Sequence, residues 1–435
     1  MGAWRRDLRI TGFAGLALLS LLVAEFGRFE PGLAHTLHES QGSLLAFRAP
    51  FTLAAFLLLL IKPQFRRVRL SDFSGWFLIY VIYFLVSSIW STDRLMTFGK
   101  GMELLIGLGI VLQVSGSGDA IYRLDALRTL LLRSISTVGT IAVAGFLLRI
   151  PAFVSQGHGL ILKSTADTPF LSSNGLGYIS SLLLLSVIAD YLSERIRGQM
   201  AILECGYAIF LFLFAESRTS IAIIVLGIGS LLARKSRALG IGYFISIFMG
   251  VSLELGKVLK LLQGSQSPGQ FDTLSGRTIM WAAAWQQWKT RPWFGFGGGA
   301  GGKFAISHLG TPSLRVVSSL HNGFLEALTG LGAIGFAAEL TVLIMVTLST
   351  YRWWRRDPGM LGIYIVIVHI WITSFMSIGA LAWMNYEVMI YLILLAVLDI
   401  RREDDRGARA SLGCEQWSGA VDPGNEKGAM TARRT

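Results

Sequence analysis

Residues 200–234, with the sequence MAILECGYAIFLFLFAESRTSIAIIVLGIGSLLAR, decide the fold of this chain. Two apolar runs, at 200–216 and 219–234, meet at a short polar junction with almost no loop between them. Runs of about 16 to 22 residues suit helices that cross a hydrocarbon layer of about 30 Å, whereas barrel strands alternate over about ten residues. The stretch therefore predicts an α-helical membrane protein that crosses the bilayer repeatedly.

The rest of the chain repeats this pattern. Hydrophobic residues make up 53% of the 435 residues and charged residues only 15%, and the mean hydropathy of +0.56 exceeds what a soluble core requires. No small-residue cleavage site follows the first apolar run, so we expect a retained helix and not a signal peptide. About twelve spans are predicted, near residues 8–26, 45–62, 73–90, 99–115, 130–150, 172–192, 200–216, 219–234, 239–255, 327–349, 360–380 and 383–399.

Basic residues set the orientation of these spans, because cytoplasmic connections are enriched in Arg and Lys. Such clusters occur in alternate connections: Arg5/Arg6, Lys62/Arg66/Arg67/Arg69, Arg123/Arg128, Arg195/Arg197, Arg234/Lys235/Arg237, Arg352/Arg355/Arg356 and Arg401/Arg402. The connections at 27–44, 91–98, 151–171, 217–218 and 256–321 are then external. We expect a bacterial inner-membrane protein with both termini in the cytoplasm and the long connection in the periplasm.

The sequence divides into four predicted parts. Residues 1–255 form an N-terminal transmembrane bundle of about nine helices, and 322–400 form the C-terminal transmembrane helices. Between them, 256–321 is a polar, glycine-rich loop of about 65 residues, a length that is usually functional. Residues 401–435 lack apolar periodicity, so we expect a disordered cytoplasmic tail.

Composition argues against several other classes of protein. The formal charge of +12 requires no nucleic-acid partner, since the basic residues lie in juxtamembrane clusters that also suit anionic lipid. Cys205 and Cys414 are both predicted on the cytoplasmic side, where neither forms an external disulfide or a metal site. External segments lack His/Asp/Glu clusters at ligand spacing, and the glycine-rich stretch 295–299 lacks the Lys-Ser/Thr of a P-loop. We therefore expect neither a metal nor another cofactor.

Two arginines on the predicted external side are candidates for anion binding. Arg218 begins a helix beside Ser217 and Thr219, so hydroxyls and backbone N–H groups accompany its guanidinium, and this combination binds oxyanions such as phosphate. An interfacial anchor or an ion pair with Glu216 is the alternative. The second cation, Arg277, follows Ser-Gly in the long loop.

Trp281, Trp285 and Trp288 repeat at helical spacing after Arg277, which predicts an amphipathic helix over 278–288 along the membrane surface. Interfacial anchoring explains these tryptophans, although aromatic rings also stack on sugars. At the end of the loop, His321 is the candidate for proton transfer, because an imidazole at the head of a helix can take a proton from a hydroxyl nucleophile. A structural role is the alternative for an isolated histidine.

The order of these motifs resembles the O-antigen ligase and polymerase superfamily. The resemblance covers roughly residues 200–350 by motif and the rest by hydropathy. Its most specific element is the spacing of the last motif. The motifs are Ser217-Arg218-Thr219, Ser275-Gly276-Arg277 with Trp281, Pro292-Trp293-Phe294-Gly295-Phe296-Gly297, and His321-Asn322 followed after nine residues by Gly332-x-x-Gly335.

This resemblance implies a GT-C-like membrane glycosyltransferase that takes a glycan from an undecaprenyl diphosphate donor and transfers it to a sugar hydroxyl in the periplasm. Carried over to this sequence, Arg218 and Arg277 bind the diphosphate and His321 activates the acceptor. Two guanidinium groups can stabilise the leaving group without a metal, and a single displacement inverts the anomeric configuration. The implied partners are the lipid-linked donor, the acceptor glycan and a chain-length regulator.

Further residues have supporting roles. We expect Gly332 and Gly335 to allow close packing of the helix that carries His321. Asn322 either orients His321, binds the acceptor or caps the helix. Three more residues, weaker candidates, are expected to line the cavity: Lys100, Glu103 and Asn174.

Alternatives remain at two levels. A ligase gives the polysaccharide to a lipid A core, and a polymerase adds it to another repeat unit of O antigen or exopolysaccharide; we favour the polymerase slightly. A multi-pass transporter or flippase is suggested by polar residues within spans such as Glu103, Arg149 and Glu387. The lack of internal symmetry and the length of the loop argue against it. A non-catalytic scaffold, the third alternative, predicts that substitutions of His321 are tolerated.

Overall fold

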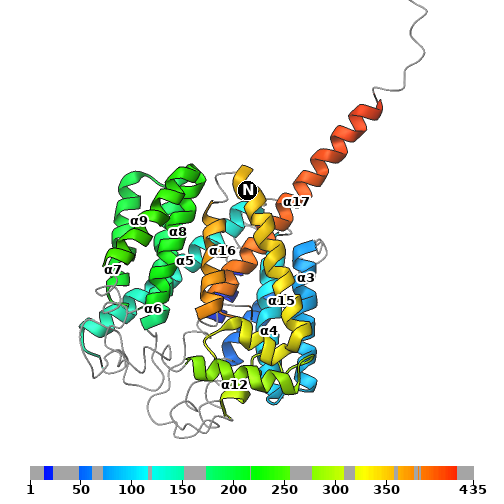
Figure 1. The fold of residues 1–435 in the computed structure, drawn as a ribbon. Coiled ribbons are helices and arrows are strands. Elements are labelled where there is room, and N and C mark those ends of the chain that lie inside the picture. Colours follow the sequence, from blue (N-terminus) through cyan, green and yellow to red (C-terminus); the bar gives the residue numbers. More distant parts are fainter. Residues whose placement is uncertain are drawn as a thin grey trace, which may run out of the picture.

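The computed structural model describes residues 14–22, 49–60, 72–115, 120–150, 173–215, 217–254, 277–307, 319–356, 361–376, 381 and 384–418. Within these ranges the chain is helical and contains no strand (Figure 1). The helices are residues 14–22, Ala49–Leu60, α3 (Asp72–Val86), the 3-10 helix η2 (Ser87–Ile89), α4 (Arg94–Ser115), α5 (Ala120–Leu147), α6 (Ser173–Leu192), α7 (Gly198–Leu213), α8 (Arg218–Lys235), α9 (Arg237–Leu253), α12 (Arg277–Thr290), α13 (Gly301–Ser307), α15 (Gly323–Arg356), α16 (Leu361–Met376) and α17 (Tyr386–Ser418).

Four helices are long and apolar enough to cross a membrane: Arg94–Ser115, Ala120–Leu147, Asn174–Leu192 and Gly323–Arg355. Five shorter apolar helices accompany them, at Ala49–Leu60, Phe73–Ile89, Gly198–Leu213, Arg237–Leu253 and Tyr364–Met376. The predicted all-helical membrane fold is confirmed. Each predicted span overlaps a helix, but the count of about twelve spans stays a prediction.

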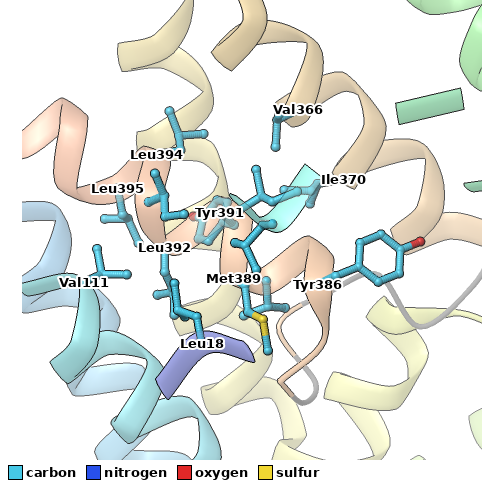
Figure 2. Close-up of a cluster of buried hydrophobic side chains, with 14 of the residues drawn as sticks. Leu18, Val111, Val366, Ile370, Tyr386, Met389, Tyr391, Leu392, Leu394 and Leu395 are labelled. Atoms are coloured by element: carbon cyan, nitrogen blue, oxygen red, sulfur yellow. The ribbon is translucent and has the colours of Figure 1, made fainter. Parts of the chain in front are cut away.

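Helix α17 forms the centre of the bundle. Its residues from Val388 to Leu398 are all buried, as expected for a helix that is apolar on every side. The cluster around this helix includes side chains from residues 14–22, α4 and α16 (Figure 2). Figure 2 labels them as Leu18, Val111, Val366, Ile370, Tyr386, Met389, Tyr391, Leu392, Leu394 and Leu395.

Helix α17 also continues beyond the bundle to Ser418 (Figure 1), so the predicted boundary at residue 401 is wrong. Two causes act together. Residues 401–418 contain four Arg, two Ala and two Glu, which are strong helix formers, and they extend a helix that has already been nucleated. Residues 419–435, the rest of the predicted disordered tail, lie outside the described residues.

Helix α12 lies across one end of the bundle (Figure 1), where α6, α8 and α15 also begin. We call this end the α12 end. Helix α12 spans Arg277–Thr290 and coincides with the surface helix predicted at 278–288. It belongs to the long predicted loop, of which residues 256–276 and 308–318 lie outside the described residues.

A break in α15 receives the glycine-rich segment that follows α12. At Gly332 the backbone leaves the helical conformation, with φ 68° and ψ −171°. Two N–H groups of the glycine-rich segment donate to carbonyls before this break: Phe296 to Thr329 at 3.0 Å and Gly297 to Gly330 at 2.7 Å. After the break the direction reverses, with Ala333 donating to Pro292 at 2.8 Å and Ile334 to Trp293 at 3.3 Å.

Both the backbone conformation and the close packing at position 332 require a glycine. Its positive φ disfavours any side chain, and a Cβ there would lie 2.2 Å from the carbonyl oxygen of Trp293. A Cβ at Gly335 would lie 2.7 Å from the Tyr83 ring of α3. Gly332 therefore allows the backbone of residues 292–297 to enter the break in α15, and Gly335 allows the Tyr83 ring to pack against the helix.

Candidate active site

Arg218 is the first residue of α8, and the preceding Ser217 caps that helix. The Ser217 hydroxyl oxygen accepts hydrogen bonds from the Ser220 N–H at 3.3 Å and the Ser220 hydroxyl at 2.7 Å. A Cβ at Gly177 of α6 would lie 2.4 Å from the Cβ of Ser217, so the first turns of α6 and α8 are in close contact. Arg218 and Thr219 are half-buried beside this contact.

Arg277 is the first residue of α12 and is held near the end of α16. Its Nη1 donates to the carbonyl of Met376 at 2.9 Å. Burial lowers the pKa of Arg277 from its ordinary value; Tyr178 opposes this shift, and the positive charge of Arg218 adds to it. An electrostatic effect of this kind requires proximity. The structure therefore places the two predicted arginines within electrostatic range of each other.

His321 lies beside the same helix. The Trp281 indole N–H, one turn after Arg277, donates to the carbonyl of Leu320 at 2.8 Å. His321 is half-buried and has a φ of 50°, a left-handed conformation that costs an L-residue about 1–2 kcal/mol. Its own N–H donates to the Ser319 hydroxyl at 3.4 Å. The imidazole is thus presented from a strained turn immediately before α15.

Asn322 acts as a helix cap. Its Oδ1 accepts a hydrogen bond from the Leu325 N–H at 3.0 Å, and its carbonyl accepts one from the Glu326 N–H at 3.0 Å. Of the roles considered for Asn322, the structure supports capping.

Glu326 is a residue of this site that sequence reasoning missed. It is 2% exposed, and its Oε1 accepts a hydrogen bond from the Leu320 N–H at 2.7 Å. A signal was available, because a carboxylate one turn into a helix often bonds back to the residues before the cap. The pattern His321-Asn322 followed by Glu326 is a stretched form of that arrangement.

The three residues predicted to line the cavity, Lys100, Glu103 and Asn174, have different surroundings in the structure. The Lys100 ammonium donates to the carbonyl of Gly299 at 3.2 Å, in the segment that packs against α15. Glu103 is buried and accepts a hydrogen bond from Thr52 at 3.4 Å. Asn174 is half-buried in the first turn of α6.

Polar residues within the spans suggested a transporter, and those in α16 and α17 contact one another. Glu387 lies 3.6 Å from the Nδ1 of His369, and it accepts a hydrogen bond from Thr373 at 3.0 Å. The other ring nitrogen of His369 is 3.1 Å from the carbonyl of Tyr178. Arg149 lies exposed after the end of α5. These contacts join helices and explain the polar residues without a transport path.

The α12 end therefore combines three features that suit an anionic substrate with a hydroxyl partner. Two arginines lie within electrostatic range of each other, and the turn that carries the half-buried His321 contacts α12 at Trp281, one helical turn after the second arginine. Helices α8, α12 and α15 also begin here, and the positive ends of helix dipoles favour anions.

Comparison with known proteins agrees with this geometry. Residues 205–340 match the family model described as O-antigen ligase, and the matched region contains Arg218, Arg277, His321, Gly332 and Gly335. No curated protein matches the chain. The match supports glycosyl transfer of the ligase or polymerase type in general. The match bears out the resemblance to the O-antigen ligase and polymerase superfamily over residues 205–340.

Proposed function

We propose that the protein transfers a glycan from a polyprenyl diphosphate carrier, of the undecaprenyl type, to a sugar hydroxyl. The proposal rests on the placement of Arg277, which bonds to the end of α16 within electrostatic range of Arg218, one helical turn from the Trp281 that contacts the turn carrying His321. Two like charges at one place repel each other, and an anion held between them relieves that repulsion. A diphosphate offers oxygens to both guanidinium groups.

In the proposed reaction, His321 accepts the proton of the acceptor hydroxyl as its oxygen attacks the anomeric carbon of the donor sugar. A new glycosidic C–O bond forms, and the bond between that carbon and the diphosphate oxygen breaks. The electron pair leaves with the polyprenyl diphosphate. Attack from the side opposite the leaving group inverts the anomeric configuration.

The two arginines supply the electrostatic stabilisation of this step. Negative charge grows on the leaving diphosphate, and each charge-assisted hydrogen bond contributes about 1.5–3 kcal/mol. General-base assistance by His321 adds a rate factor of about 10²–10⁴. In this proposal the guanidinium groups take the part that a metal ion has in many phosphate sites.

The proposed cellular setting follows from the distribution of charge. The basic clusters orient the α12 end toward the periplasm of the bacterial inner membrane, where lipid-linked glycans are accessible. The acceptor is either another lipid-linked repeat unit or a lipid A core oligosaccharide, and we favour the first slightly. A chain-length regulator is a further proposed partner.

A glycan gel tests the proposal. Cells that lack the protein are complemented with wild type or His321→Ala, and both lipopolysaccharide and lipid-linked intermediates are analysed. We expect His321→Ala to accumulate in the membrane at wild-type amounts without restoring the glycan pattern. Single repeat units on the carrier identify a polymerase, and long chains on the carrier identify a ligase. If wild type and His321→Ala restore the glycan pattern equally, the proposal is contradicted, and the transporter and scaffold alternatives are favoured instead.

A further inference from the structure

We propose that Glu326 is a positioning residue that aims the imidazole of His321 through the backbone. This inference rests on the proposed function, in which His321 accepts a proton. The role of Glu326 is to fix the short turn from which His321 projects.

The contacts of Glu326 point to that turn. The carboxylate is 2% exposed, and it accepts the N–H of Leu320, the residue before His321, at 2.7 Å. On the other side of the histidine, the carbonyl of Asn322 accepts the Glu326 N–H at 3.0 Å. One residue therefore holds both neighbours of His321, one by its side chain and one by its backbone.

This restraint matters because the backbone of His321 is strained. A φ of 50° is unusual for a residue with a Cβ and persists only where surrounding contacts impose it. Relaxation toward negative φ would rotate the Cα–Cβ bond and redirect the imidazole. The hydrogen bond from Leu320 to Glu326 opposes that rotation.

The surroundings of Glu326 supply hydrogen-bond donors to its carboxyl group. The N–H of Gly302 in α13 also donates to it, and a Cβ at Gly302 would lie 2.1 Å from Oε2. Lys100 adds a favourable electrostatic interaction. Two backbone donors converge on the side chain, so a glutamine that turned its NH₂ toward either of them would place two donors against each other.

Glu339 provides a matched control on the same helix. It is also fully buried, and it accepts hydrogen bonds from the Leu381 N–H at 3.3 Å and the Tyr80 hydroxyl at 3.4 Å. Those contacts join α15 to α3 and to Leu381, which precedes α17, and they lie far along the helix from His321. Glu339→Gln therefore reports the general effect of neutralising a buried carboxylate in α15.

The experiment compares purified Glu326→Gln, Glu326→Asp, Glu339→Gln and His321→Ala in lipid vesicles that contain a polyprenyl-diphosphate-linked glycan. The measured quantities are kcat and the KM for the donor, each per folded molecule. We expect Glu326→Gln to lower kcat by about 10²-fold, the cost of a misplaced catalytic group, with the donor KM unchanged. Glu326→Asp, which keeps the carboxylate, should recover part of kcat. Glu339→Gln should keep wild-type kcat.

The variants separate this inference from the function on which it rests. If His321→Ala loses activity while Glu326→Gln keeps wild-type kcat, the positioning role is overturned and the proposed function stands. If both keep wild-type kcat, the proposed function fails too. Should Glu326→Gln not fold, Glu326→Asp decides: a lowered kcat with unchanged donor KM supports the role, and wild-type kcat overturns it.

Discussion

At one end of α6 the arginines lie against carboxylates of the same chain, with Arg128 3.2 Å from Asp190 and Arg195 3.1 Å from Asp125. At the other end of α6, roughly 28 Å away along the helix, Arg218 acts on Arg277 as a like charge. Both ends contain half-buried or buried guanidinium groups. They differ in the charges found to act on them: carboxylates at the first end, and at the second a like charge, Arg218, which adds to the effect of burial on Arg277.

We propose that this difference separates structural charge from functional charge. An arginine that faces a carboxylate is neutralised when the protein folds, and it joins helices. Two arginines within electrostatic range of each other add a repulsion that a bound anion would relieve. Composition shows only that both kinds of arginine are present, and their three-dimensional arrangement supports the proposal that the pair at the α12 end binds an anion.

The largest expected effect comes from removing both arginines of the α12 end. Each guanidinium contributes about 1.5–3 kcal/mol, so Arg218→Ala and Arg277→Ala should each lower transfer by about 10- to 100-fold, and the double variant by the larger factor of about 10²–10⁴. Donor binding and transfer rate, measured in vesicles, check this expectation. The exposed Arg94→Ala at the start of α4 serves as the control. Wild-type donor binding in the double variant contradicts a diphosphate site between these arginines.

Replacing the guanidinium at position 277 by an ammonium tests whether the shape of the cation matters as well as its charge. Arg277→Lys should lower transfer about tenfold at neutral pH, because a point charge cannot form the bidentate contact of a guanidinium. The surroundings lower the pKa of a cation at this position, first by burial. A lysine, with an ordinary pKa of about 10.4, then loses its charge as the pH rises toward that value, whereas arginine keeps it. The ratio of wild-type to variant rates should therefore grow between pH 7 and 9.5. A constant ratio would be evidence against an effect of charge.

Substitution at the Arg128–Asp190 ion pair should change the stability of the protein and not its activity. Arg128→Gln leaves the carboxylate of Asp190 without its close guanidinium partner, and we expect a loss of roughly 2–4 kcal/mol in the free energy of unfolding. Thermal unfolding in detergent measures this loss, and activity per folded molecule should equal wild type. Adding Asp190→Asn should recover part of the stability. Reduced activity in folded Arg128→Gln would contradict this expectation, because it would show that arginines at both ends of α6 contribute to activity.

The smallest effect is expected at Asn322, where substitutions test whether this residue of the α12 end has a structural role. Asn322→Ala removes the cap on α15 and should cost about 1 kcal/mol, whereas Asn322→Ser retains a capping oxygen and should restore most of it. The KM for the acceptor should be unchanged in Asn322→Ser. A raised acceptor KM in the serine variant would assign Asn322 to substrate binding instead.

Much of the fold followed from local patterns. Apolar runs predicted a helix at each span, and the spacing of three tryptophans predicted α12, because the periodicity of a helix is written in its own residues. The length of α17 did not follow, since polarity was taken as disorder although the residues are strong helix formers.

The site was only partly predictable for the same reason. Arg218, Arg277 and His321 could be named from residue type and motif, but their approach depends on how α8, α12 and α15 pack. Glu326 was missed because its importance lies in a backbone contact with Leu320. The entry of residues 292–297 into the break at Gly332 is likewise a long-range backbone pairing, which no local pattern encodes.

The most direct test of the central claim is the release of polyprenyl diphosphate from a lipid-linked glycan by purified protein in vesicles, with acceptor present. Wild type and His321→Ala are compared at equal amounts of folded protein and with equal donor affinity verified. The account predicts that wild type releases the carrier as the glycan is transferred, and that His321→Ala releases it about 10²–10⁴-fold more slowly. Equal rates of release from the two proteins would contradict it.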